Sequence, residues 1–156
     1  FQKEKNNSKN KNYDVTIDPG HGGMDGGGAS GNYKETDFTM DISKKVKSNL
    51  EKAGITVKLT HDEGDIDKNH VMDEYNKGGR AVIPNEVKSK YTFSIHINKS
   101  GSSKVKGIEL YTPSDINYDL VQDIVNNITN NTSLGYSSNR LYKKFDGTYT
   151  HNFTES

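Results

Sequence analysis

Two histidines and one glutamate stand at positions where side chains could bind a metal ion. His21 lies in DPGHGG (residues 18–23), where Pro and Gly interrupt a short apolar alternation. Glu35 directly precedes an amphipathic helical pattern, and His96 lies in the strand-like run TFSIHIN (residues 92–98). A hydrolytic zinc centre needs three protein ligands and an open position for water. Two imidazoles and a carboxylate, all at the ends of predicted elements, form a candidate open site of this kind.

Each of the three residues also has a simpler interpretation. His21 could be a loop histidine without a partner, and His96 a core histidine whose ring bonds the backbone. Glu35 could be a carboxylate favoured by the dipole at the start of a helix. The three do not form a contiguous motif, so their spacing alone leaves these alternatives open.

Apolar periodicity predicts strands that alternate with helices along the chain. The alternation predicts an α/β fold, in which a single domain has a mixed, mostly parallel β-sheet flanked by helices on both faces. The predicted strands cover residues 13–18, 55–60, 91–98 and 107–112, and the predicted long helices cover residues 34–53 and 119–128.

The helix over 34–53 has the clearest pattern. Phe38, Ile42, Val46 and Leu50 recur every four residues and predict its buried face, and Gly54 marks its end. Between the elements, residues 20–32 are predicted to be an irregular loop and 61–79 a long loop with at most one helical turn. Pro84 predicts that any helix in 80–90 is short or begins near the proline. The segment 129–156 has no assignable pattern.

The composition narrows the class of protein. The chain has 156 residues, 21 basic and 21 acidic, which gives no electrostatic reason to expect a nucleic-acid partner. It has no cysteine, which excludes Cys-based zinc sites and thiol nucleophiles. No apolar segment reaches 18 residues, so we expect no membrane insertion of this chain. The polar segment 1–12 is predicted to be a linker to a signal or anchor further upstream, and 13–156 to be one folded domain, which we expect to be a monomer.

Several ordered motifs resemble the type 3 family of N-acetylmuramoyl-L-alanine amidases, which are zinc-dependent peptidoglycan hydrolases. The family's DPGHGG.D.G opening is matched by residues 18–27, its glutamate before the first helix by Glu35, and its SIHxN strand end by residues 94–98. Weaker similarities lie at residues 54–60, 80–85, 107–109 and 139–140, although His61 stands where arginine is usual and Pro84 is atypical. The resemblance covers residues 14–140 in the family's order.

The resemblance implies a function and a set of ligands. His21, Glu35 and His96 would hold zinc (Zn²⁺), and the chain would hydrolyse the amide between N-acetylmuramic acid and the L-alanine of the stem peptide. The partner would be peptidoglycan, as a muramyl peptide. Because this substrate lies outside the plasma membrane, the protein is expected to be exported and to act extracellularly, in the bacterial wall or the spore cortex.

The family's general base does not carry over clearly. The family has a glutamate near its C-terminus, on an apolar strand of the type V-x-V-E. Here only Glu155 lies at a comparable distance after His96, and its polar neighbours do not resemble a buried strand. We therefore expect the chain to end before the last strand and its base; the alternative is that Glu155 is the base.

Two other functions remain open. A catalytically inactive module could bind peptidoglycan without the metal, and another zinc enzyme, such as a peptidase, could cleave a different amide. Among the remaining polar residues, Asp18 is expected to bond a ligand histidine or to cap the turn that follows it, Asp25 to be a loop residue, and His61, His70 and His151 to lie on the surface.

Overall fold

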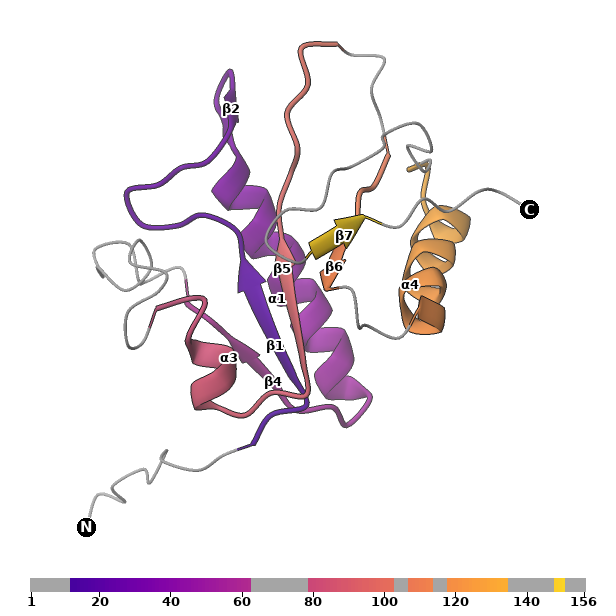
Figure 1. Ribbon diagram of the computed structural model, residues 1–156. Coiled ribbons are helices and arrows are strands. Elements are labelled where there is room, and N and C mark those ends of the chain that lie inside the picture. The colour runs from indigo at the N-terminus through magenta and orange to yellow at the C-terminus, as the bar shows by residue number, and fades with distance from the viewer. Residues whose placement is uncertain (1–11, 63–78, 103–106, 114–117, 135–147, 151–156) are drawn as a thin grey trace. The chain divides into compact units, whose positions relative to one another are not determined.

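The computed structural model describes residues 12–62, 79–102, 107–113, 118–134 and 148–150 (Figure 1). The chain forms two compact units, residues 1–99 and residues 100–156, and each is described here by itself. The first unit contains all three residues of the predicted metal site.

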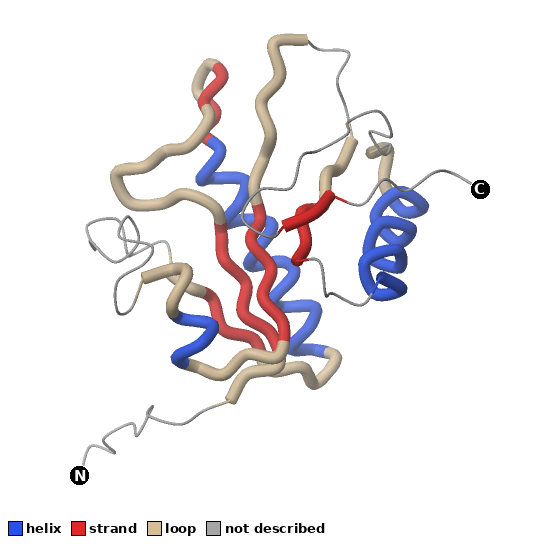
Figure 2. Tube along the Cα trace, viewed as in Figure 1, coloured by secondary structure: helices blue, strands red, loops and turns tan. Residues whose placement is uncertain are grey.

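The core of the first unit is a parallel three-stranded sheet in the order β4-β1-β5 (Figure 2). Strand β1 (Val15–Pro19) is central, between β4 (Val57–Leu59) and β5 (Tyr91–Ile95). Every residue of β1 is buried, as expected for a central strand covered on both faces. The predicted α/β class with a mostly parallel sheet is therefore confirmed.

The two faces of the sheet are covered by different helical segments. Side chains alternate along β1, so Val15 and Ile17 share one face, where they pack with Leu50 of α1 (Glu35–Lys52). Thr16 and Asp18 project from the other face and hydrogen-bond Ser89 and Arg80. These two partners flank the short helix α3 (Ile83–Glu86), which begins next to Pro84 as predicted.

Helix α1 ends where the sequence predicts. Gly54 has a φ of +82°, a left-handed conformation that glycine adopts without steric cost. The Gly54 amide donates to the Glu51 carbonyl and the Ile55 amide to the Leu50 carbonyl, both at 3.0 Å. This pair of bonds is a Schellman motif, which satisfies carbonyls left free at a helix end.

The predicted buried face of α1 is wrong over most of its length. Thr39, Met40 and Ser43 are buried, whereas Phe38, Ile42 and Val46 are exposed and only Leu50 of the predicted stripe packs on the core. Four residues advance about 40° beyond one full helical turn, so a four-residue repeat drifts around the helix by about 120° from Phe38 to Leu50. Thr39 is buried because its hydroxyl donates to the Gly20 carbonyl at 2.7 Å, next to the end of β1.

One short hairpin was not predicted from the sequence. The loop predicted over 20–32 contains β2 (Ala29–Ser30), which pairs with β3 (Tyr33–Lys34) in a small antiparallel hairpin. Most of the loop predicted over 61–79 and nearly all of the linker over 1–12 lie outside the described residues.

The second unit contains a helix and a two-stranded antiparallel ribbon. Helix α4 (Tyr118–Asn131) contains the predicted helix over 119–128, and its Val121 and Val125 are buried against Ile108 and Leu110. Strand β6 (Tyr111–Pro113) begins later than predicted and pairs with β7 (Thr148–Thr150), which falls in the unassigned segment. None of the described helices is long and apolar enough to cross a bilayer.

The observed face of α1 predicts a ranking of two substitutions. Met40 is 6% exposed and Ile42 is 37% exposed. Met40→Ala should lower the free energy of unfolding by about 2–5 kcal/mol, because it leaves a cavity in a packed region. Ile42→Ala should lower it by about 0.5 kcal/mol, as at a surface position. Urea unfolding of both variants measures the difference, and the reverse ranking would restore the face predicted from the sequence.

Candidate metal centre

His21 is held in a strained turn directly beyond β1. Its φ of +64° is uncommon for a residue with a side chain, although histidine is among those that tolerate it. Gly22 and Gly23 follow with φ values of +134° and +59°, and Gly22 and Asp25 bridge back to each other through two backbone hydrogen bonds. The glycines therefore allow a sharp reversal that keeps His21 at the end of the strand.

Glu35 is fixed by two backbone amides from distant segments. Its Oε2 accepts from the Gly28 amide at 2.9 Å and its Oε1 from the Ile97 amide at 2.8 Å, and its side chain is 9% exposed. Burial by itself raises the pKa of Glu35, but these amides together with His21 and His96 lower it below its ordinary value. The first residue of α1 therefore presents an ionised, oriented carboxylate.

His96 follows β5 and packs closely against the turn after β1. A Cβ atom on Gly20 would lie 2.5 Å from the Ile95 carbonyl oxygen and 2.6 Å from Cε1 of His96. Only glycine at position 20 leaves room for the ring. The Gly20 amide also donates to the Ile95 carbonyl at 2.8 Å, so the two histidine-bearing strand ends stay paired.

The three predicted residues converge. The distances between donor atoms are 3.1 Å from His21 Nε2 to Glu35 Oε1, 3.3 Å from His96 Nδ1 to Glu35 Oε1, and 3.2 Å between the two nitrogens. A tetrahedral zinc with bonds of about 2.0–2.1 Å requires ligand atoms about 3.3 Å apart. The triangle fits three ligands of a four-coordinate ion and leaves the fourth position for a substrate or water.

Asp25 belongs to this site, although its sequence context predicts only a position in the loop. Its Oδ2 lies 2.8 Å from Nδ1 of His21, and its Oδ1 accepts from the Gly27 amide at 3.0 Å. The hydrogen bond to His21 and the Gly27 amide lower the pKa of Asp25. Nδ1 of His21 therefore carries the proton and Nε2 keeps its lone pair free for a metal. The sequence feature that could have identified Asp25 as a partner of His21 is its position four residues after His21, within the glycine-rich motif.

Two polar residues occupy places other than those expected. Asp18 neither bonds a candidate ligand nor caps its turn, since its carboxylate pairs with Arg80 and with two hydroxyl groups, those of Thr60 and Ser94. His61, the second residue after β4, is buried with its Nδ1 3.2 Å from the Thr60 hydroxyl, so its predicted surface position is wrong. Glu155, His70 and His151 lie outside the described residues.

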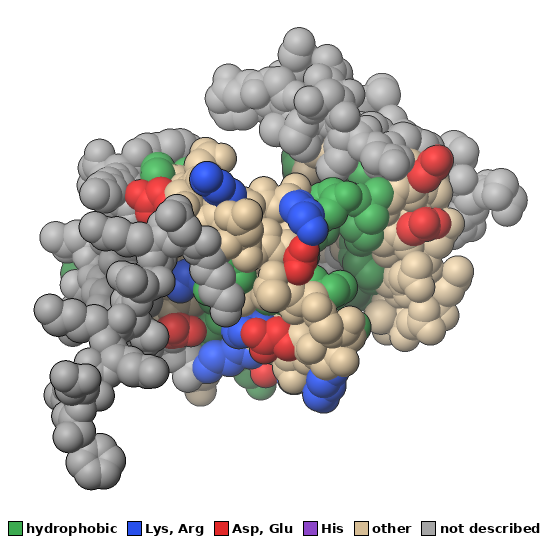
Figure 3. Space-filling view, turned by 90° about the horizontal axis from the view of Figure 1, so that it is seen from below, with side chains coloured by type: hydrophobic (Ala, Val, Ile, Leu, Met, Phe, Trp, Pro, Cys, Tyr) green, Lys and Arg blue, Asp and Glu red, His purple; other side chains and the backbone are tan. Residues whose placement is uncertain are grey.

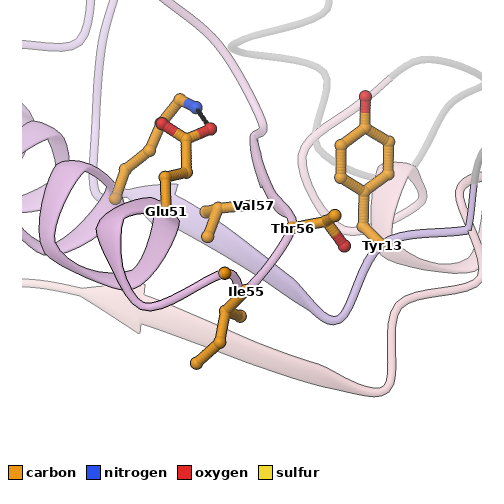
Figure 4. Close-up of a pocket in the computed structure, with 7 residues that line it drawn as sticks. Tyr13, Glu51, Ile55, Thr56 and Val57 are labelled. Atoms are coloured by element: carbon orange, nitrogen blue, oxygen red, sulfur yellow. Dashed lines mark hydrogen bonds and ion pairs between the residues drawn. The ribbon is translucent and has the colours of Figure 1, made fainter.

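The opposite end of the sheet, where the strands begin, carries a pocket. The pocket is lined by Tyr13 and Thr56, which precede β1 and β4, and by the ion pair between Lys47 and Glu51 (Figure 4). The face seen from below carries acidic and basic side chains in close mixture and shows none of the described histidines (Figure 3). His21 and His96 of the candidate metal centre lie instead just beyond the carboxyl ends of β1 and β5, where ligands of parallel α/β sheets usually bind.

The fold and the three converging donors place the chain among α/β proteins with a candidate hydrolytic metal centre at the strand ends. The sequence model of N-acetylmuramoyl-L-alanine amidase matches residues 15–153, and the chain belongs to this family.

Individual relatives agree with this assignment. The probable cell wall amidase LytH of Staphylococcus aureus is 35% identical over 70% of this chain and 33% of its own length. The amidase AmiC2 of Nostoc punctiforme is 30% identical, with a TM-score of 0.63 over 79% of this chain and 65% of its own. The CwlD amidase of Clostridioides difficile, solved with the GerS lipoprotein, is 28% identical, with a TM-score of 0.52 over 67% of this chain and 58% of its own. The chain thus spans about a third of the length of the curated relatives it matches.

Gly27 offers a test of how tightly the donors are packed. A Cβ atom on Gly27 would lie 2.6 Å from the His21 ring and 2.9 Å from Cβ of Glu35, whereas one on Gly31 would meet nothing within 4 Å. Both glycines have φ near +60°, so Gly27→Ala and Gly31→Ala share the backbone cost of about 1–2 kcal/mol. We expect only Gly27→Ala to weaken zinc binding as well, by about tenfold or more. Chelator competition measures this, and equal zinc affinities in the two variants would contradict it.

Asp25 should matter for metal affinity more than for folding. Asp25→Ala should weaken zinc binding by about 10–100-fold, because nothing then fixes the proton on Nδ1 of His21. Asp41→Ala, which removes an exposed carboxylate paired with Lys45 on α1, is the matched control and should bind zinc normally. Isothermal titration with zinc measures both, and a normal affinity in Asp25→Ala would show that the hydrogen bond does not orient His21.

Proposed function

We propose that the chain catalyses hydrolysis of the amide between N-acetylmuramic acid and L-alanine of peptidoglycan, with zinc held by His21, Glu35 and His96. The observation that carries the proposal is the convergence of these three donors within 4.8 Å in a member of the amidase family. The similarity to probable cell wall amidases supports peptidoglycan as the substrate and a site of action outside the plasma membrane.

The protein's own groups orient the site. Zinc, when bound, supplies a Lewis acid that polarises the scissile carbonyl and acidifies water. Asp25 keeps the proton of His21 on Nδ1, and the Gly28 and Ile97 amides hold the Glu35 carboxylate in one orientation. Because these partners are in place before substrate arrives, the donors need little reorganisation during the reaction.

The general base must come from another residue. In the described part of the chain, the carboxylates around the donors are Asp25 and Glu35, and both are already bonded to ring or backbone nitrogen atoms. The family's pattern favours a glutamate on an apolar strand as this base, and the alternative within the sequence is Glu155. A base of this kind contributes about 10²–10⁴-fold to the rate.

Metal content and product analysis test the proposal. The chain, purified without chelator, should contain about one zinc, as a three-ligand centre does. It should release free L-alanine amines from peptidoglycan without new reducing sugar ends. His96→Ala should lose both the zinc and the activity, whereas His70→Ala, which removes a histidine outside the ligand set, should keep both. Glu155→Gln should keep zinc and lose about 10²–10⁴-fold in rate if Glu155 is the base.

Other outcomes assign other functions. A folded chain without zinc that still sediments with wall fragments would be a binding module, and would overturn the proposal. Zinc together with cleavage of a different amide would identify another zinc amide hydrolase. A normal rate in Glu155→Gln would exclude Glu155 as the base and leave the ligand assignment intact.

A further inference from the structure

One buried carboxylate links the carboxyl ends of all three strands of the sheet. Oδ1 of Asp18 accepts hydrogen bonds from the Thr60 hydroxyl and from Nε of Arg80, both at 2.7 Å. Oδ2 accepts from the Ser94 hydroxyl at 2.6 Å and from Nη2 of Arg80 at 2.9 Å. Asp18 lies in β1, Thr60 directly follows β4, and Ser94 lies in β5. We call these four residues the Asp18 clamp.

The clamp is charged and saturated. Asp18 is 8% exposed and Arg80 is 6% exposed. A carboxylate has about four acceptor positions, and the four hydrogen bonds fill them. Burial by itself raises the pKa of Asp18, but the Arg80 guanidinium and the hydroxyls of Ser94 and Thr60 lower it below its ordinary value. The rigid two-pronged contact with Arg80 fixes the carboxylate's direction as well as its charge.

The clamp lies directly before the metal donors along both histidine-bearing strands. Asp18 and Ser94 are register partners, and the next pair is Pro19 with Ile95. His21 follows Asp18 by three residues, and His96 follows Ser94 by two. The hydrogen bond between Ser94 and Asp18 is therefore the last described side-chain link between β1 and β5 before the two histidines.

Metal binding makes this register important. Ligand groups must be held within about 0.5 Å of their productive positions. A shift of one residue between parallel strands displaces a strand by about 3.3 Å, as much as the whole separation of the donor atoms. The register of a strand is well specified where a face is buried, as in β1, and less so where its side chains are exposed, as along most of β5. A side-chain hydrogen bond across one register pair adds a directional restraint there.

We infer that the hydrogen bond between Ser94 and Asp18 within the Asp18 clamp positions His21 and His96 for metal binding, because it joins the two strands that lead to them, whereas Thr60 joins the same carboxylate only to β4. The inference rests on the proposed function, because it takes these histidines as metal ligands. Asp18 and Ser94 act through the strands, so they are positioning residues and not catalytic ones.

Two single substitutions separate positioning from general stabilisation. Ser94→Ala and Thr60→Val each remove one hydroxyl donor from the same carboxylate, but only Ser94 lies on a strand that carries a donor. Ser94→Ala should weaken zinc affinity about tenfold, as expected for loss of an outer partner. Thr60→Val should change it by less than about twofold, even if it destabilises the fold equally. Chelator competition is run at a temperature where melting curves show both metal-free variants folded.

Two further readouts support the comparison. The visible spectrum of the cobalt-substituted protein reports ligand geometry, and it should change in Ser94→Ala and not in Thr60→Val. Ser94 is exposed, so Ser94→Thr can be accommodated and, by keeping the hydroxyl, should restore the affinity and the spectrum.

The outcomes are distinct. Normal zinc affinity in Ser94→Ala, equal weakening by both variants, or no rescue by Ser94→Thr would each overturn the positioning role while the proposed function stands. An unsubstituted chain that binds no zinc would overturn the proposed function and the clamp inference with it. If Ser94→Ala does not fold, Ser94→Thr still decides, because weakened binding there would contradict the clamp.

Discussion

The parallel pairing of β1 with β5 is the constraint on which the candidate site depends. It brings His21 and His96, which are 75 residues apart in the sequence, to a ring-nitrogen separation of 3.2 Å. Both histidines lie just beyond the carboxyl ends of these strands, outside the residues that pair with each other. The sheet therefore acts as a rigid frame, and the loops beyond it need to place only a few side chains.

Two glycines at this end of the sheet leave space for the donor side chains. Gly20 leaves space for the His96 ring, and Gly27 leaves space for the His21 ring. Glu35 then closes the triangle from the start of α1, held by amides from the glycine loop and from the residue after His96. Glu35 and His96 are thus each restrained by a segment that carries another donor, so the site depends on the pairing of these segments.

Polar side chains do much of the packing on the face of the sheet opposite α1. Asp18, Thr60 and Arg80 are buried there, where apolar residues are the usual choice. A buried ion pair is seldom the most stabilising solution, because desolvation offsets most of its Coulomb energy. What the ion pair adds is directional hydrogen bonds, which fix the strand ends in one arrangement. Apolar side chains pack without such directionality and would allow several arrangements.

The sequence by itself determined the α/β class, the three strands of the parallel sheet and helix α1 to within a few residues, and the three residues that converge. These features depend on local periodicity, on glycine and proline, and on motifs in a recognisable order, all of which are present in the linear chain. Only the tertiary structure decided which face of α1 is buried and what Asp18, Asp25 and His61 contact. Those outcomes depend on the drift of a helical stripe and on partners brought together by folding, and no local pattern contains them.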